Sequence, residues 1–184
     1  MTTIDGRTDP DETIARWRAE EAVIRTRACA APGVASSAQV AGRNGLQLFQ
    51  ALLAGEIPRP PMAGTLDFIL LYIDRGFAVF QGRPSPDHYN PMGTVHGGWF
   101  ATLLDSAMGC AVHSTLPPGK AYTTLELKLN LVRALTDAVP LVRAEGTVVH
   151  GGRQVATAEG RLIGPDGRLY AHASTTCLVF DQPR

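Results

Sequence analysis

One acidic residue, Asp105, lies in the middle of a nearly apolar stretch that runs from Thr94 to Val112. Burying an unpaired carboxylate is costly, so an acid at this position must either have a polar partner or take part in the function of the protein. Two glycines, Gly97 and Gly98, stand where the helix predicted for this stretch begins. Backbone N–H groups at a helix start lack partners inside the helix and carry partial positive charge. Together, the carboxylate and these N–H groups could form a catalytic site.

On a helical wheel of about 100° per residue, this stretch has one broad apolar sector and one narrow strip of small residues. The strip consists of Gly98, Thr102, Asp105 and Gly109, at spacing i, i+4, i+7 and i+11. Small residues allow another backbone or a ligand to approach closely. The strip therefore indicates one of two arrangements. Either the helix packs across a subunit interface with Asp105 hydrogen-bonded there, or Asp105 faces a narrow channel between subunits. Both predict an oligomer.

The surrounding elements follow from periodicity and turn residues. Helices are expected from Pro10 to about Ala30 and at Leu46–Ala54, followed by an extended connector at Pro58–Pro61 and, later, the apolar helix His96–Ser114. The expected strands are Leu66–Ile73, Phe77–Gln81, Thr124–Leu131, Leu141–Val149, Gln154–Ile163 and Arg168–Phe180. Tight turns make the later strands antiparallel. A single apolar helix must be wrapped by the sheet to be buried, so the fold class is α+β.

Strict alternation also predicts which side chains share a face. In the strand Thr124–Leu131 the leucines should face one way, and Thr124, Glu126 and Lys128 the other. In the last strand Leu169 should point with the alanines, and Tyr170 should point away from them.

The composition excludes several classes of protein. The chain has 184 residues, 45% hydrophobic and 18% charged, with 17 basic and 17 acidic residues. This balance gives no reason to expect a nucleic acid or a membrane surface as partner, and no apolar run approaches the ~18 residues that span a bilayer. Three widely spaced cysteines, Cys29, Cys110 and Cys177, are expected to be buried free thiols in a reducing compartment. The sequence thus predicts a cytoplasmic protein.

The run from Asn90 to Gly98, together with Asp105, resembles the PaaI-like acyl-CoA thioesterases of the hotdog fold, which act on phenylacetyl-CoA and related substrates. The pattern is N-x-x-G-x-x-H-G-G with an acid seven residues after the second glycine. The likeness covers roughly residues 62–182. It implies a hotdog domain over 62–184, an antiparallel sheet curled around one long central helix. Residues 1–61 form an N-terminal helical extension of open role. The resemblance also implies homodimers with sheets joined edge to edge, arranged as a dimer of dimers (a homotetramer), and sites at the dimer interface.

The resemblance also implies roles for single residues. Asp105 would act as general base on water or as nucleophile, and the Gly97 N–H would polarise the thioester carbonyl. Asn90 would help to hold that carbonyl or the water. A hydroxyl at the start of the next strand would position the water; this is Thr124 or Thr123, where family members often have Ser.

Three other candidates, His96, Trp99 and Arg153, carry two interpretations each. His96 is either a catalytic base or a residue that orients the turn by hydrogen bonds. Gly98 leaves the approach to the carbonyl open, and Trp99 either lines an acyl pocket or belongs to the core. Arg153 either meets the phosphates of coenzyme A or is a solvated turn residue. The remaining histidines, such as His113, lack partners at metal-ligand spacing and are expected in loops or at the surface. Hydrolysis of a thioester by a carboxylate and backbone N–H groups needs no metal and no organic cofactor, so none is predicted.

The sequence therefore predicts an enzyme that hydrolyses an acyl-CoA to the free acid and coenzyme A. The alternative is a hotdog protein that binds acyl-CoA as a regulator or carrier without cleaving it. A hotdog dehydratase or hydratase would pair a histidine with an acid in a different pattern, which this chain lacks. The acyl group stays open among aromatic, short and medium chains.

Overall fold

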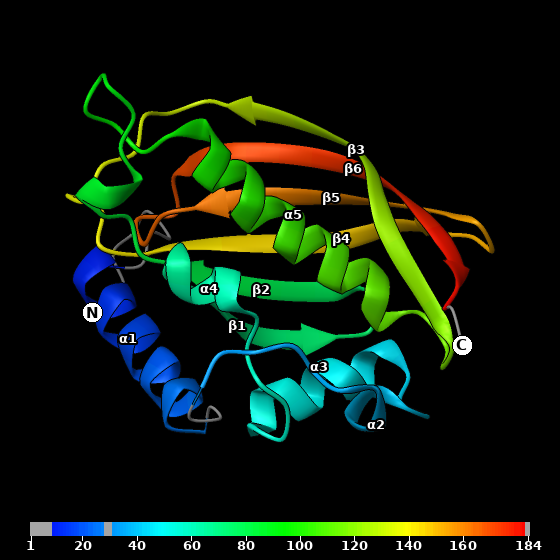
Figure 1. Cartoon of the computed structure of the whole chain (residues 1–184). Helices are drawn as coiled ribbons and strands as arrows, with labels where there is room; N and C mark the ends of the chain where they lie inside the picture. The colour runs from blue at the N-terminus through cyan, green and yellow to red at the C-terminus, as the bar shows by residue number, and fades with distance from the viewer. Residues whose placement is uncertain (1–8, 28–30, 183–184) are drawn as a thin grey trace.

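The computed structural model of the chain describes residues 9–27 and 31–182. Six antiparallel strands form one sheet that curls around a long helix, α5 (Gly97–Ser114) (Figure 1). The strand order is β1-β2-β4-β5-β6-β3. The bounds are β1 Phe68–Asp74, β2 Phe77–Gly82, β3 Lys120–Leu131, β4 Val142–Gly151, β5 Val155–Ile163 and β6 Leu169–Asp181. The predicted α+β hotdog architecture is confirmed, including the order of two strands, helix and four strands.

The core lies between α5 and the concave face of the sheet. Phe100, Leu103 and Leu104 of α5 are almost fully buried there. The helix crosses β4 so closely that a Cβ atom on Gly146 would lie 2.4 Å from the backbone carbonyl carbon of Ala107. Only glycine leaves room for that crossing. This close crossing therefore fixes the distance between α5 and the sheet and determines which face of the helix points towards the sheet.

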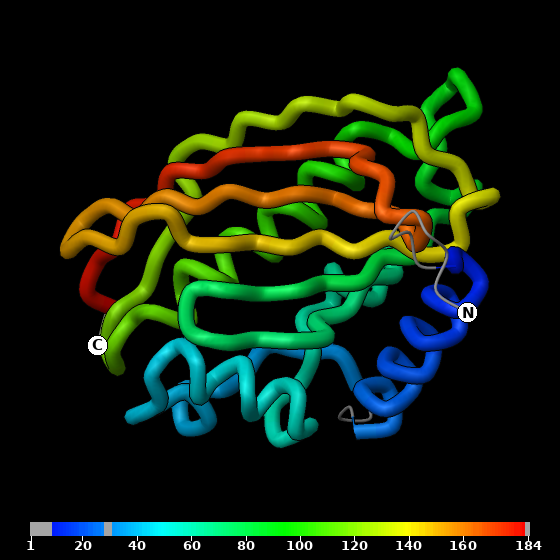
Figure 2. Tube along the Cα trace, turned by 180° about the vertical axis from the view of Figure 1, so that it is seen from behind, coloured from blue at the N-terminus to red at the C-terminus, as the bar shows by residue number. Residues whose placement is uncertain are grey.

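The described part of the N-terminal region adds four helices: α1 (Pro10–Arg27), α2 (Ser37–Val40), α3 (Gly45–Ala54) and α4 (Pro61–Thr65). Figure 2 shows α2 and α3 along the β1 edge of the sheet, with α1 beside them. Residues 28–30, where the first helix was expected to end, lie outside the described residues, as does Cys29. The extended connector predicted up to Pro61 is wrong at its end. Pro61 begins α4 because proline is favoured at the first position of a helix.

A bulge changes the side chains that the last strand buries. Ile163 of β5 pairs with Leu169, and Leu162 pairs with Ala171, so Tyr170 is the extra residue. The bulge turns Tyr170 inward, where it is 4% exposed, and leaves Leu169 37% exposed. The alternation predicted for these two residues was therefore wrong.

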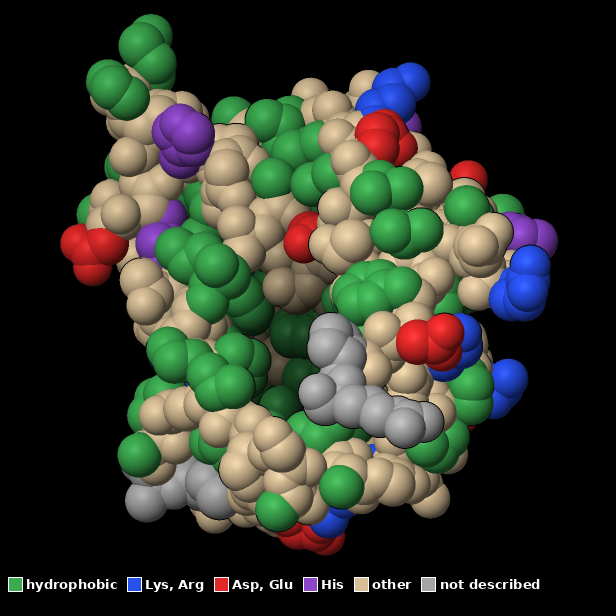
Figure 3. Space-filling view, turned by 45° about the vertical axis from the view of Figure 1, so that its right-hand side comes forward, with side chains coloured by type: hydrophobic (Ala, Val, Ile, Leu, Met, Phe, Trp, Pro, Cys, Tyr) green, Lys and Arg blue, Asp and Glu red, His purple; other side chains and the backbone are tan. Residues whose placement is uncertain are grey.

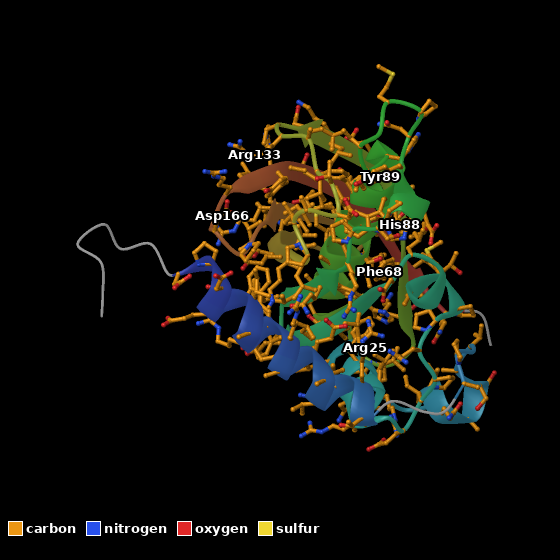
Figure 4. All side chains as sticks on the ribbon, turned by 90° about the vertical axis from the view of Figure 1, so that its left-hand side faces the viewer. Arg25, Phe68, His88, Tyr89, Arg133 and Asp166 are labelled. Atoms are coloured by element: carbon orange, nitrogen blue, oxygen red, sulfur yellow. The ribbon has the colours of Figure 1, made fainter. Side chains whose placement is uncertain are left out.

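A buried acid, Glu21, fastens α1 to the sheet. Its side chain is 4% exposed and accepts hydrogen bonds from Arg25 Nε (2.5 Å), Gln81 Nε2 (2.6 Å) and Arg83 Nη2 (3.0 Å). Figure 4 shows Arg25 at the end of α1, on the side where the helix meets the rest of the fold. Nearby, the Arg143 guanidinium lies 4.3 Å from the centre of the Trp17 ring. Burial alone would raise the pKa of Glu21. The hydrogen bonds of Arg25 and Gln81 and the charges of Arg25 and Arg83 outweigh that effect and lower it.

We expect Glu21→Gln to lower the free energy of unfolding by about 2 kcal/mol at neutral pH. This is less than for a fully buried pair, because both arginines are partly exposed. A lowered folded pKa means that the contribution is complete above the ordinary value of 4.5 and is lost as pH falls through the folded pKa. The difference between wild type and variant, measured by urea unfolding, should therefore shrink below about pH 4.5. Glu20→Gln, which alters a half-exposed acid of the same helix, is the matched control. Equal losses in the two variants would contradict the assignment.

Candidate active site

Asp105 and Thr124 meet between α5 and β3. The Thr124 hydroxyl donates a hydrogen bond to Asp105 Oδ1 at 2.9 Å. Both side chains are half-buried, whereas Thr123 is exposed. Of the two threonines that the sequence left open, Thr124 therefore contacts the acid.

A bulge in β3 makes this contact possible. Thr124 pairs with Cys177 and Glu126 with Thr176, so Leu125 stands outside the ladder and is 60% exposed. Without the bulge, Thr124 and the half-buried Leu127 would point to opposite faces. The strict alternation predicted for this strand was wrong at Leu125, and the irregularity directs Thr124 towards α5.

The acid lines a cavity of about 190 Å³. The α5 side of the cavity carries Asp105, Ser106 and Cys110, and most of the remaining surface is apolar. Figure 3 shows a hollow among hydrophobic side chains, with an acidic side chain beside it. The other lining residues are Phe49, Leu52, Arg59, Pro60, Met62, Ala63, Phe68, Ile69, Leu70, Phe80 and Tyr122.

Cys110 also faces this cavity as a free thiol. Burial raises its pKa, and the negative charge of Asp105 raises it further. The thiol therefore stays protonated at neutral pH and is a poor nucleophile. Cys177 is likewise a free, buried thiol whose pKa is raised by burial. Of the ionisable groups along this wall, the carboxylate of Asp105 is the one suited to act as base or nucleophile.

The glycine turn at the start of α5 presents a free N–H group. His96 is the N-cap residue, and its ring Nδ1 accepts the Gly98 N–H at 2.9 Å. Among the described residues, none accepts the Gly97 N–H. Gly97 lines a second depression, of about 290 Å³, with Asn90, Phe100 and the segment from Leu131 to Leu135. Among the described residues, the Gly97 N–H is therefore left available beside this depression, while His96 caps the turn.

Asn90 shapes the loop before this turn. Its side-chain oxygen accepts the N–H groups of Met92 (2.8 Å) and Thr94 (3.3 Å), and its Nδ2 donates to the Thr94 hydroxyl. The next residue back, Tyr89, donates to Asp137 Oδ1 at 2.6 Å, which ties the loop to the segment after β3. His88 and Tyr89 lie together on this loop, beside the start of α5 (Figure 4). Hydrogen bonds within the loop and to the segment after β3 therefore hold the loop in place.

The two parts of the site lie apart within one chain. Gly97 and Asp105 are eight residues apart on α5, which corresponds to about 12 Å along the helix. A base and an oxyanion donor that serve one carbonyl must lie within about 3 Å of the reacting atoms.

The strand β3 lies at an edge of the described sheet and pairs only with β6. Exposed Leu125, Leu131 and Val132 lie on or just after this strand.

The remaining sequence candidates lie elsewhere. Trp99 is 4% exposed, donates from Nε1 to the Leu66 carbonyl and does not line the Asp105 cavity. Arg153 is exposed in the turn between β4 and β5, at the far end of the sheet from the start of α5 (Figure 1). His113 was expected in a loop or at the surface, which is wrong. It lies on α5, with its ring centre 5.4 Å from those of Phe49 and Tyr122.

The cavity is also lined by residues that the sequence analysis did not single out, chiefly Phe49, Leu52 and Met62 from α3 and α4. The apolar face of the helix at 46–54 was the available signal. Among the described residues, no group of three His, Cys, Asp or Glu side chains is arranged to hold a metal ion. In the same part of the chain, no helix is both long and apolar enough to cross a membrane.

Comparison with known proteins identifies the family. The model of the thioesterase superfamily matches residues 92–171. A phenylacetic acid degradation-related protein from Ralstonia eutropha JMP134 has a similar structure with a TM-score of 0.65 and 32% identity, over 71% of this chain and 98% of the other. This chain belongs to the thioesterase superfamily.

Two further solved structures agree with this thioesterase-superfamily fold. A point mutant of the phenylacetic acid degradation protein PaaI from Thermus thermophilus has a TM-score of 0.58 and 28% identity, over 64% of this chain and 97% of that protein. For the PaaI protein of the E. coli phenylacetic acid degradation operon, the TM-score is 0.60 and the identity 20%, over 66% and 85% of the two chains. The predicted PaaI-like hotdog assignment is confirmed.

A curated relative from Halobacterium salinarum, whose name proposes esterase activity, is 41% identical over 73 residues. The match spans 40% of this chain and about half (48%) of the relative's length.

Proposed function

We propose that this protein is an acyl-CoA thioesterase that hydrolyses an acyl-CoA to the free acid and coenzyme A. The observation that carries the proposal is the Asp105–Thr124 pair, a carboxylate held by a hydroxyl at the wall of an apolar cavity. An apolar cavity with a few convergent polar groups is the usual form of a small-molecule site. Membership of a family of thioester hydrolases supports the same chemistry.

In this proposal Asp105 either takes a proton from the attacking water or attacks the thioester carbonyl itself. In the first case, Thr124 helps to hold that water beside the acid. The carbonyl oxygen gains negative charge in the transition state, and a preorganised N–H donor stabilises it. The tetrahedral species then expels coenzyme A as a thiolate, which takes up a proton. In the first case this step yields the free acid directly. In the second case it leaves a mixed anhydride between the acyl group and Asp105, which water hydrolyses to the free acid and the restored carboxylate. A carboxylate and a backbone amide suffice for these steps, so we propose that the reaction needs no metal and no organic cofactor.

The N–H group comes from Gly97 of a second copy of the chain. Two features support this arrangement: the separation of about 12 Å between Gly97 and Asp105 within one chain, and the unpaired edge of β3 with its exposed leucines. We therefore propose a homodimer joined through β3, arranged further as a dimer of dimers, with each site built from both subunits. Asn90 holds the glycine turn in place, and His96 caps it. We place the protein in the cytoplasm.

The test is a panel of purified acyl-CoAs with acetyl, butyryl, hexanoyl, octanoyl, palmitoyl, benzoyl and phenylacetyl groups, with released coenzyme A measured by a thiol reagent. The proposal expects turnover with at least one of them. Binding of acyl-CoA without release of coenzyme A from any of them would overturn it and favour a regulator or carrier.

A further inference from the structure

The cavity beside Asp105 is closed by residues from α3, from α4 and from the connector between these two helices. Phe49 and Leu52 come from α3, Met62 and Ala63 from α4, and Arg59 and Pro60 from the connector between them. We propose that these residues, here called the acyl wall, form the far end of the acyl pocket and set the length of the acyl group that this protein hydrolyses. The inference rests on the proposed thioesterase function and assigns a selective role to a segment outside the catalytic residues.

The polar and apolar groups of the cavity lie on different elements. Asp105 and Ser106 stand on α5, whereas Phe49 and Leu52 stand on α3, and Phe68 and Leu70 of β1 also line the cavity. A thioester carbonyl placed at Asp105 therefore directs its acyl chain towards α3. Met62 is 56% exposed and lies at the rim, and apart from Arg59 the acyl wall consists of hydrocarbon side chains.

The size of the cavity limits the acyl group. A dry cavity of about 150 Å³ lined by Leu, Ile and Phe holds a benzene ring, and this cavity has a volume of about 190 Å³. It has room for a phenyl-sized group or a short to medium alkyl chain. A long-chain fatty acyl group is larger than this cavity of a single chain.

The wall is held rigidly against α5. Asn44 caps α3 by accepting the Gln47 N–H, and the Gly45 N–H donates to the Leu116 carbonyl at 3.0 Å. A Cβ atom on Gly45 would lie only 1.7 Å from the His113 carbonyl oxygen, so the helix start abuts the backbone of α5 directly. Burial lowers the pKa of His113, which keeps its ring neutral between Phe49 and Tyr122. An acyl chain thus meets a preformed surface rather than a mobile flap.

This wall lies before the residues that match the family model. The family match begins at residue 92, whereas α3 and α4 end by Thr65. The side chains that catalyse and the side chains that close the pocket therefore belong to separate segments. Substitutions in the wall should change which acyl group is hydrolysed and leave the chemistry at Asp105 intact.

The test compares Leu52→Ala with Leu53→Ala, using kcat/KM for straight-chain acyl-CoAs from acetyl to dodecanoyl. Both leucines are half-buried in α3 and pack against the core, but only Leu52 lines the cavity. Leu52→Ala should move the optimum to longer chains by about two methylenes and raise the preference for them by roughly fourfold to tenfold per methylene. Leu53→Ala should keep the wild-type optimum, and Leu52→Phe should move it to shorter chains.

The outcomes separate this inference from the proposed function. Suppose that wild type hydrolyses members of the panel, but Leu52→Ala and Leu52→Phe have the same optimal chain length as Leu53→Ala. The acyl-wall inference is then wrong, and the proposed thioesterase function still stands. If wild type hydrolyses nothing, the thioesterase proposal fails. The wall is then tested by the dissociation constants of hydrolysis-resistant alkyl thioethers of coenzyme A. In the two Leu52 variants, the chain length that gives the lowest dissociation constant must differ from that of wild type, and in Leu53→Ala it must not. Otherwise the inference fails as well.

Discussion

Replacing Asp105 by Asn is expected to lower kcat for acyl-CoA hydrolysis by about 10²–10⁴-fold, the usual contribution of a positioned general base. The amide has nearly the same shape as the carboxylate, and its oxygen can still accept the Thr124 hydroxyl. It cannot take a proton from water or act as an anionic nucleophile. The substitution should therefore lower kcat and change KM little. The measurement is the release of coenzyme A from the substrate that wild type hydrolyses best.

Two controls define what this result means. Unfolding midpoints of wild type and Asp105→Asn should agree closely, which excludes a folding defect as the cause. Ser106→Ala changes the neighbouring polar residue at the cavity wall, whose hydroxyl donates to the Thr102 carbonyl of its own helix, and should retain most of the activity. A kcat for Asp105→Asn within threefold of wild type would remove Asp105 from the catalytic step.

The second large effect is expected from Gly97→Pro, which removes one N–H group. Gly97 is the first residue of α5, a position where proline is tolerated. His96 before it has φ −64° and ψ 139°, a conformation that suits a residue preceding proline. The helix should therefore survive, while the donor for the oxyanion is lost. Loss of one such donor lowers kcat by about 10²–10³-fold.

Gly97→Ala is the matched control for this variant. It adds the same Cβ atom, 3.0 Å from Leu131 Cδ1, but keeps the N–H group. The Leu131 methyl is the end of a flexible side chain and can give way. We expect Gly97→Ala to retain activity within about tenfold of wild type, so that most of the loss in Gly97→Pro belongs to the N–H group. Similar losses in the two variants would assign the effect to crowding and reject the donor role.

Local patterns predicted much of this fold. The apolar periodicity from Gly97 to Ser114 and the tight turns between the later strands were sufficient for the helix, the order of the elements along the chain and the antiparallel direction of the later strands. The spacing from the glycines to Asp105 identified the parts of the candidate site. These signals are local, because each element carries its own period and its own end signals.

Features that depend on pairing between distant segments were not predictable in the same way. The bulge at Leu125 arises from the register between β3 and β6, and alternation in one strand cannot report it. The buried position of Glu21 depends on Arg83 and Gln81, about sixty residues away. The acyl wall likewise needs α3 docked on α5 before Phe49 and Leu52 can reach the cavity.

The central claim, that each site joins Asp105 of one subunit to Gly97 of another, is tested most directly by mixing two inactive variants. Asp105→Asn and Gly97→Pro chains are co-expressed with different tags, and the mixed dimers are purified and assayed. Each mixed dimer has one site with both groups intact and one site with neither. If pairing is random, the unfractionated mixture should regain about one quarter of wild-type activity, and purified mixed dimers about one half. Mixed dimers as inactive as either parent would show that both groups act within one chain and would contradict the account.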